Sequence, residues 1–134
     1  MVLKKIIFII SISITFLFSS EIEAKLYDKL FTTLFSKNIV KIYTENPEIK
    51  KLKYKNIVFV DDCKKADIVI GKIKQKCNKP VFVLSFKDYK HQKNAIGAFY
   101  WRKGRPQLRL RWIVIKKYHL YLSNDFKDFV DEIS

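Results

Sequence analysis

Residues 57–84 read IVFVDDCKKADIVIGKIKQKCNKPVFVL and contain three runs of consecutive apolar residues, at Ile57–Val60, Ile68–Ile70 and Val81–Leu84. Apolar runs of this length without polar alternation are typical of strands that are buried on both faces of a sheet. A sheet that is covered on both sides needs flanking helices. The stretch therefore predicts an α/β fold with a layered, Rossmann-like sheet.

The segment that precedes this stretch predicts one helix and one further strand. Between Lys25 and Ser36 apolar residues recur at steps of three and four, which is the pattern of a helix with one buried face. They are Leu26, Leu30, Phe31, Leu34 and Phe35. Ile39–Tyr43 is short and β-branched and predicts a strand, which Asn46 and Pro47 end.

The segment that follows predicts a β-hairpin. Ile96–Trp101 has the composition of a strand, and Lys103–Pro106 has that of a turn. After the turn, Leu108, Leu110 and Trp112 alternate with polar residues, as in a strand that is exposed on one face. The alternation places these three side chains in the core, and we expect Trp101 of the preceding strand to be buried with them.

Two further helices complete the predicted domain. A short helix covers Ile113–Tyr118, and a last helix runs from Asn124 to about Ile133 with Ser123 as its cap. The chain shows no repeat, linker or second domain. We therefore expect a small single-domain layered sheet with flanking helices, a C-terminal β-hairpin and a terminal helix.

The composition excludes several classes of protein. Of the 134 residues, 49% are apolar and 15% are aromatic, which is enough to form a core and excludes a disordered chain. The chain is too short for a kinase or a barrel enzyme. Its 27 Lys and Arg against 13 Asp and Glu give a formal charge of +14, which favours association with anions.

The first 24 residues have the layout of a secretory signal peptide. Lys4 and Lys5 precede the uncharged run Ile6–Phe18, which at about 1.5 Å per residue is shorter than the ~30 Å hydrocarbon core of a membrane. Ala24 supplies a small residue for cleavage. We expect a signal peptide over residues 1–24 and a periplasmic domain over residues 25–134, with an uncleaved anchor as the alternative.

Export affects the interpretation of the two cysteines, Cys63 and Cys77. In an oxidising compartment such residues are more often paired than free, and a disulfide here would close a short loop around the strand Ala66–Gly71. The alternatives are two buried free thiols or a metal site. A metal site would need His or carboxylate partners at a suitable spacing.

No stretch carries the motif of a catalytic nucleophile, a zinc protease, a phosphate-binding loop or a dinucleotide site. Asp61 and Asp62 follow a buried strand, where α/β folds often place ligand groups, but neighbouring strand residues point to opposite faces. The alternative is a solvated strand end. His91 and His119 are isolated. We therefore expect no catalytic residue, no cofactor and no metal, and thus a protein that is not an enzyme.

Four arginines are concentrated on the predicted hairpin: Arg102, Arg105, Arg109 and Arg111. Arg is favoured over Lys where a planar carboxylate or phosphate is held in a fixed geometry. The four residues are thus a candidate surface for a ligand or partner, with a solvated sheet face as the alternative. An anionic membrane surface or a carboxylate-rich protein fits an exported chain as partner, and nucleic acid does not.

The C-terminal half resembles the YfiR-like family of small periplasmic regulatory proteins over roughly residues 57–130. The resemblance lies in the order of five segments, which are Ala66–Gly71, Pro80–Ser85, Ile96–Trp101, Gly104–Arg111 and Leu120–Ser123. It implies a compact α/β domain without catalysis. It also implies action by protein contacts on a membrane-bound signalling protein, such as a diguanylate cyclase or a sensor kinase.

Two functions follow as hypotheses. The first is a non-enzymatic periplasmic sensor or regulatory protein that contacts a membrane signalling protein. The alternative is a small periplasmic solute-binding protein that holds an anionic ligand with the arginines of the hairpin and therefore needs a concave pocket.

Overall fold

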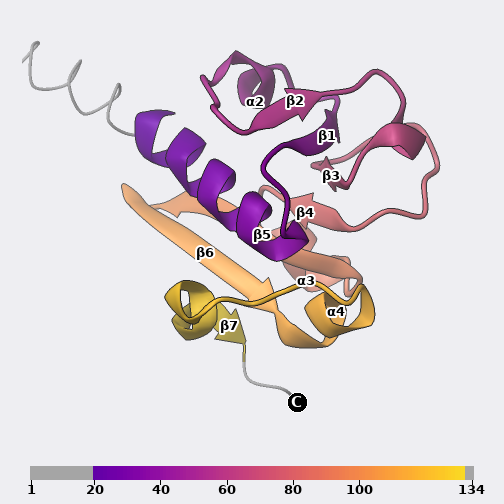
Figure 1. Cartoon of the computed structure of the whole chain (residues 1–134). Coiled ribbons are helices and arrows are strands. Elements are labelled where there is room, and N and C mark those ends of the chain that lie inside the picture. Colours follow the sequence, from indigo (N-terminus) through magenta and orange to yellow (C-terminus); the bar gives the residue numbers. More distant parts are fainter. Residues whose placement is uncertain (1–19, 132–134) are drawn as a thin grey trace, which may run out of the picture.

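A computed structural model describes residues 20–131, and in this part the chain forms one seven-stranded sheet (Figure 1). The strands lie in the order β2-β1-β3-β4-β5-β6-β7. Their bounds are β1 Val40–Thr44, β2 Ile57–Phe59, β3 Ile68–Ile70, β4 Val81–Val83, β5 Ala95–Arg102, β6 Arg105–Arg111 and β7 Val130–Asp131. The α/β class expected from the apolar runs is confirmed.

The first five strands across the sheet, β2 to β5, are parallel, and β6 joins them as the antiparallel arm of a hairpin. The three apolar runs are strands β2, β3 and β4. The expectation that all three are buried on both faces is wrong for β2, because β2 lies at the edge of the sheet and Val58 is 49% exposed.

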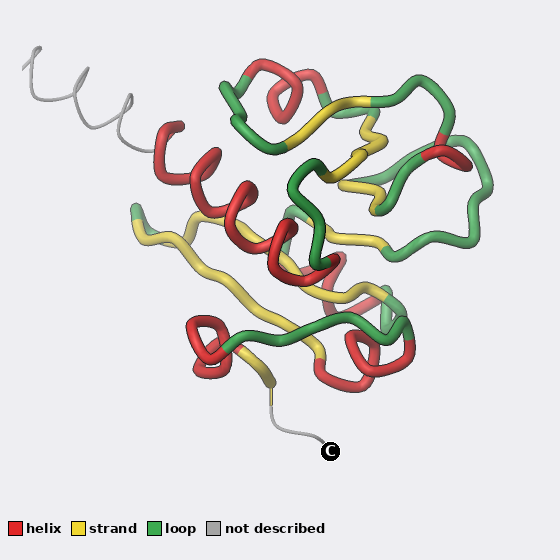
Figure 2. The backbone as a smooth tube through the Cα atoms, in the orientation of Figure 1, coloured by secondary structure: helices red, strands yellow, loops and turns green. Residues whose placement is uncertain are grey.

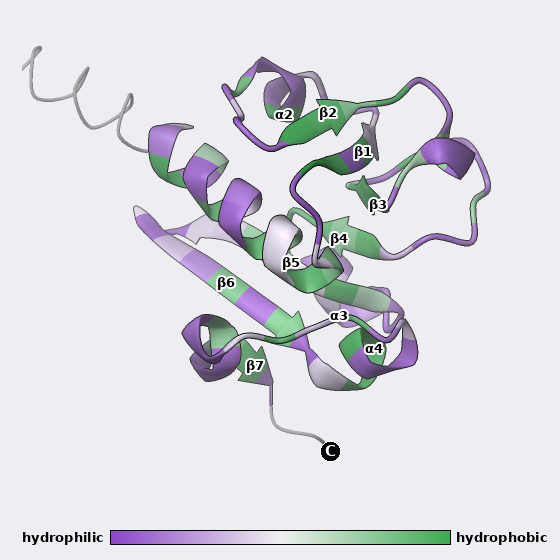
Figure 3. Cartoon of the chain, in the orientation of Figure 1, coloured by the Kyte–Doolittle hydropathy of each residue, from purple (hydrophilic) through white to green (hydrophobic). Residues whose placement is uncertain are grey.

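A long helix over residues 20–35 lies across one face of the sheet (Figure 1). Along this helix Figure 3 shows hydrophilic segments alternating with hydrophobic ones. The buried residues of the helix recur at the predicted helical spacing. They include Tyr27, Leu30, Phe31 and Leu34, all at most 2% exposed. The helix was expected from Lys25 and already includes residues 20–24.

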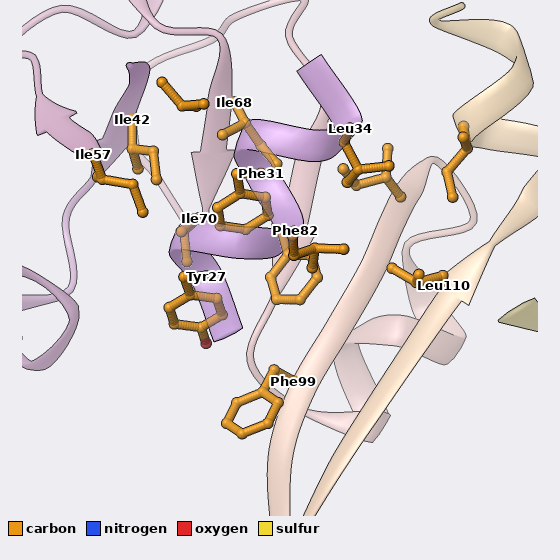
Figure 4. Close-up of a cluster of buried hydrophobic side chains, with 14 of the residues drawn as sticks. Tyr27, Phe31, Leu34, Ile42, Ile57, Ile68, Ile70, Phe82, Phe99 and Leu110 are labelled. Carbon is orange, nitrogen blue, oxygen red and sulfur yellow. The ribbon is translucent and has the colours of Figure 1, made fainter. Parts of the chain in front are cut away.

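The main core lies between this helix and the sheet, and aromatic rings form its centre (Figure 4). The ring of Phe82 on β4 lies 5.3 Å from that of Phe31 and 5.8 Å from that of Tyr27, both edge to face. Phe99 on β5 lies 5.8 Å from Tyr27. Edge-to-face contacts add to the gain from apolar burial, so this cluster fixes how the helix sits on the sheet.

The two faces of the sheet are covered by different elements. Helices α2 (Pro47–Lys51) and α4 (Trp112–Lys117) pack on the same core as the long helix, through Ile49 and through Val114 and Ile115. The opposite face is covered by the 3-10 turn η1 (Cys63–Lys65), the loop before β4 and helix α3 (Phe86–His91). Figure 2 shows the long loops that join β2, β3 and β4 beyond the sheet.

The disulfide between Cys63 and Cys77 is confirmed, with 6.1 Å between the two Cα atoms. Cys63 is 1% exposed and packs with Tyr43, Ala66 and Val69 under the sheet. The bond therefore anchors the loop before β4 to η1. Together they cover β1 and β3 on the face of the sheet opposite to the long helix.

Two short helices were missed. Asn46 and Pro47 follow the end of β1, as expected, and the Asn46 side chain also accepts from the N–H groups of Glu48 and Ile49 and thereby begins α2. The polar stretch from Lys87 onward contains α3, which the Ser85 hydroxyl caps by accepting from the N–H of Asp88 at 3.0 Å.

The C-terminal helix expected from Asn124 to Ile133 is wrong. The chain forms a 3-10 helix, η2 (Asn124–Phe129), and then the short strand β7 beside β6, while residues 132–134 lie outside the described part. The Ser123 hydroxyl makes no capping bond. Pairing of Val130 with Leu110 gives the backbone a partner on β6 that a longer helix would lose.

The expected signal peptide, residues 1–24, falls mostly on residues 1–19, which lie outside the described residues. Within residues 20–131, none of the helices combines the length and apolar character that crossing a membrane requires. Ala24, the expected cleavage residue, belongs to the long helix and is 5% exposed.

Candidate functional site

The far end of the β5–β6 hairpin gathers exposed basic side chains. Arg102 and Arg105 form the last pair of the two strands, and Lys103 lies in the turn between them. Within residues 20–131 none of the three forms an ion pair. Trp101, beside them, is 38% exposed, so the expectation that it is buried in the core is wrong: it lies near the free end of the hairpin. We call Trp101, Arg102, Lys103 and Arg105 the hairpin tip.

A tight turn holds the hairpin tip in a fixed shape. Lys103 and Gly104 both have positive φ, at 52° and 76°, as the two central residues of a type I′ turn do. This turn matches the twist of the paired strands, so the basic side chains stand on a rigid hairpin. Pro106 follows at once and offers no N–H to a further strand.

Arg109 lies farther along β6 and forms internal contacts. Its guanidinium donates to the Asp131 carboxylate on β7 at 3.0 Å, and the hydroxyl of Tyr89 donates to the other oxygen of that carboxylate. The guanidinium also lies 5.2 Å from the ring centre of Phe86. These contacts join β6, β7 and α3.

The same cluster shifts the protonation of its members. Burial, followed by the hydrogen bond to Asp131, raises the pKa of the Tyr89 phenol, so Tyr89 is a neutral donor at physiological pH. The hydrogen bond to Asp131 raises the pKa of Arg109. Arg109 therefore stays charged, and the Asp131 side chain accepts from both Arg109 and Tyr89.

Arg111 is held by backbone oxygens at the carboxyl end of α3. Its guanidinium donates to the carbonyl oxygens of Tyr89, Gln92 and Ala95 at 2.7, 2.8 and 2.9 Å. The guanidinium also lies 4.0 Å from the ring centre of Tyr89. The carbonyls of Tyr89 and Gln92 stand where α3 ends and lacks intrahelical donors, and that of Ala95 begins β5, so Arg111 ties the end of α3 to the start of β5.

The four arginines therefore do not form one surface. Arg109 and Arg111 share a face of β6, as the alternation predicts, but α3 covers this face, which was expected to be either solvated or a recognition surface. Arg102 and Arg105 lie at the other end of the strand, about 20 Å from Arg111 at ~3.3 Å per residue. A binding role stays a prediction for Arg102 and Arg105, and the contacts of Arg109 and Arg111 favour a structural role.

A half-buried carboxylate next to the hairpin tip was missed from the sequence. Glu23, in the first turns of the long helix, accepts from the Tyr27 hydroxyl at 3.1 Å, and the Trp101 side chain also hydrogen-bonds to it. Burial raises the pKa of the Glu23 carboxyl, although these two hydrogen bonds act in the opposite direction. Glu23 thus links the hairpin tip to the long helix. Glu23 and Trp101 are far apart in the sequence, so no local sequence pattern could indicate that they meet.

The other candidate residues have local roles. Asp62 accepts from the N–H of Lys64 and caps η1, which fits the interpretation of Asp61 and Asp62 as a strand end. His119 has a φ of 55° just after α4. Within residues 20–131, no three His, Cys, Asp or Glu side chains lie close enough together to hold a metal ion.

A pocket of about 480 Å³ lies at the amino ends of β4 and β5, at the opposite end of β5 from the hairpin tip. It is lined by Cys77, Asn78, Lys79, Val81, His91, Gln92, Lys93, Asn94, Ala95 and Tyr118. None of the four hairpin arginines lines it. A solute-binding site in this pocket would therefore use residues other than those expected from the sequence.

Comparison with protein families, with curated proteins and with solved structures finds no match for this chain. The resemblance to the YfiR-like family therefore stays a prediction.

Proposed function

We propose that this chain is a non-enzymatic regulatory protein of the periplasm that acts by protein contacts, and that the hairpin tip is its binding surface. The observation that carries the proposal is the difference between the two pairs of arginines. Arg109 and Arg111 are engaged inside the domain, whereas Arg102 and Arg105 are exposed and form no ion pair within residues 20–131.

The composition of the hairpin tip supports binding to a protein. Trp and Arg are the residues most enriched among those that dominate the energy of protein interfaces, because they combine a large contact area with directed hydrogen bonds. The rigid turn means that little conformational entropy is lost when the tip binds. Its positive charge fits a carboxylate-rich partner surface.

The compartment and the class of partner rest on the sequence and on the disulfide. The disulfide fits an oxidising compartment, and the apolar N-terminal run fits export. The resemblance to the YfiR-like family supports a membrane-bound signalling protein as the partner, such as a diguanylate cyclase or a sensor kinase.

The test is affinity purification of the tagged protein from membranes of its own source, followed by titration of the recovered partner's outer domain. We expect the parent to recover one membrane protein with a signalling domain. Arg102→Glu with Arg105→Glu should weaken its binding at least about tenfold, because like charges would then face each other. The matched control is Lys50→Glu with Lys53→Glu, which changes the charge equally at exposed residues away from the tip.

Two outcomes would contradict the proposal. One is equal binding of the partner by the tip variant and the control variant. The other is binding of the parent to protein-free vesicles of anionic lipid, but to no membrane protein, which would make the lipid surface the partner of the tip.

A further inference from the structure

The pocket at the amino ends of β4 and β5 is lined by basic side chains and by no carboxylate. Lys79, Lys93 and His91 line it, and no Asp or Glu is among its lining residues. Its volume of about 480 Å³ falls within the range of small-molecule sites, roughly 300–1,000 Å³. Asn78, Gln92 and Asn94 add side-chain amides that can donate to a ligand oxygen.

The carboxylates on the neighbouring elements are already paired with other groups. Asp88 of α3 lies 3.6 Å from the ammonium of Lys72. Asp131 of β7 is held by Arg109 and Tyr89. Neither lines the pocket, so the positive charge on the pocket wall is not neutralised by them.

The carboxyl end of α3 would normally repel an anion, because its last carbonyl oxygens carry a partial negative charge. Here two of these oxygens, on Tyr89 and Gln92, accept from the guanidinium of Arg111, as does the carbonyl oxygen of Ala95 at the start of β5. Gln92 and Ala95 also line the pocket. Arg111 therefore places a third positive charge behind the wall and satisfies the groups that would oppose an anion.

The wall that carries Lys79 is anchored. Cys77, two residues earlier, lines the pocket and is bonded to the buried Cys63. Lys79 itself is half-buried and has no ion pair among residues 20–131. A lysine in that position gains by binding an anion, since an opposite charge offsets the cost of its partial burial.

We propose that this pocket binds a small free anion, a phosphate or a small carboxylate, between Lys79 and Lys93. The amide side chains would donate to its oxygens, and Arg111 acts as a positioning residue behind the wall. The site is separate from the hairpin tip, so a failure of the partner test leaves this inference standing, and the reverse is also true.

The test is titration of the purified, disulfide-bonded protein with inorganic phosphate and with citrate, followed by calorimetry and by amide NMR shifts. We expect saturable binding of at least one probe, with the largest shifts at the amides of Asn78, Lys93 and Asn94. Lys79→Gln with Lys93→Gln should weaken binding by about tenfold, because both charge contacts with the anion are lost. The matched control is Lys50→Gln with Lys53→Gln, which removes the same charge elsewhere and should leave the affinity within about twofold.

Three results would overturn the inference. The first is the absence of saturable binding of either probe. The second is an equal loss of affinity in the pocket variant and the control, which would mean that only the net charge of the protein matters. The third is binding to vesicles of mixed phosphatidylglycerol and phosphatidylcholine without binding of free phosphate or citrate. In that case the basic residues of the pocket would bind a lipid surface and not a small free anion.

Discussion

Arg111 and Tyr89 are in contact in two ways: the guanidinium of Arg111 lies 4.0 Å from the centre of the Tyr89 ring and donates to the carbonyl oxygen of the same residue at 2.7 Å. Tyr89 is 3% exposed, whereas Arg111 is half-buried. A cation over an aromatic ring is attracted more strongly where water is excluded. The pair therefore fastens α3, which covers one face of the sheet, to strand β6 of that sheet.

Replacing Arg111 should show this role in the stability of the domain. Arg111→Ala removes the guanidinium from three carbonyl oxygens, of which that of Gln92 keeps another donor, the N–H of Ala95. We expect a loss of about 2–3 kcal/mol in the free energy of unfolding, measured by urea denaturation. Arg105→Ala, the matched control at the exposed hairpin tip, should stay within about 0.5 kcal/mol of the parent. Equal effects of the two changes would show that the contacts of Arg111 add nothing to stability.

Two glycines should differ sharply in their tolerance of a methyl group. A Cβ on Gly97 would lie 2.5 Å from the backbone oxygen of Arg109 and 2.8 Å from the Leu110 side chain. Gly97→Ala should therefore cost about 3 kcal/mol or more, because a backbone atom of β6 must move. Gly104 has open space around it and a φ of 76°, so Gly104→Ala should cost only about 1 kcal/mol, from backbone strain.

Thermal unfolding monitored by circular dichroism measures both variants. If Gly104→Ala lowers the stability more than Gly97→Ala does, the close approach of β5 and β6 is not the reason for a glycine at position 97.

The disulfide should contribute a measurable share of the stability. Cys63 and Cys77 are separated by 14 positions, and the chain-entropy relation gives about 3 kcal/mol for a loop of this size. Cys63→Ala with Cys77→Ala should lower the free energy of unfolding by about that amount in denaturant titrations. In the parent, a thiol reagent under denaturing, non-reducing conditions should give no adduct, and two adducts per chain would contradict the bond.

The half-buried Glu23 should give the stability a dependence on pH. Burial raises its pKa above the ordinary 4.5, so the folded protein binds this proton more tightly than the unfolded chain does. Its contribution is therefore fully present below pH 4.5 and is lost as the pH rises through the raised pKa. Glu23→Gln keeps an acceptor for Tyr27 but has no charge, so the variant should gain stability relative to the parent over this interval.

The measurement is the difference in free energy of unfolding between parent and variant from about pH 4 to about pH 7, on a chain that retains residues 20–24. If the difference in free energy of unfolding between parent and variant does not change with pH, Glu23 binds its proton equally well in the folded and the unfolded chain.

The elements that the sequence predicts well are those in which many residues repeat one pattern. The long helix shows its buried face at several successive turns, and β3 and β4 are uninterrupted apolar runs. The hairpin is also predicted, because its turn and the alternation after it agree. In each case the local pattern and the packing in the fold favour the same structure.

The elements that were missed are short or depend on distant partners. Helix α3 buries only Tyr89, so it has no apolar periodicity, and its one local signal is the cap at Ser85. At the C-terminus, Phe126 and Phe129 are three residues apart, a spacing that suits a 3-10 helix as well as an α-helix. Whether the chain continues as a helix or joins β6 as a strand depends on β6, which the local sequence does not include.

The candidate site was predicted only in part, for the same reason. Alternation along β6 correctly places Arg109 and Arg111 on one face, but what covers that face depends on α3, which the sequence pattern did not reveal. The pocket is formed by three segments that are adjacent only in the folded chain. No spacing within one segment could have indicated it.

The position of Ala24 has a consequence for the order of leader cleavage and folding. The bond between Ala24 and Lys25 lies inside the long helix, and Ala24 is buried. Peptidases cut exposed and flexible segments, so this bond is accessible only while the helix is open. If the leader is removed after Ala24, its removal must come before the domain folds, and a chain that folds first would keep its leader.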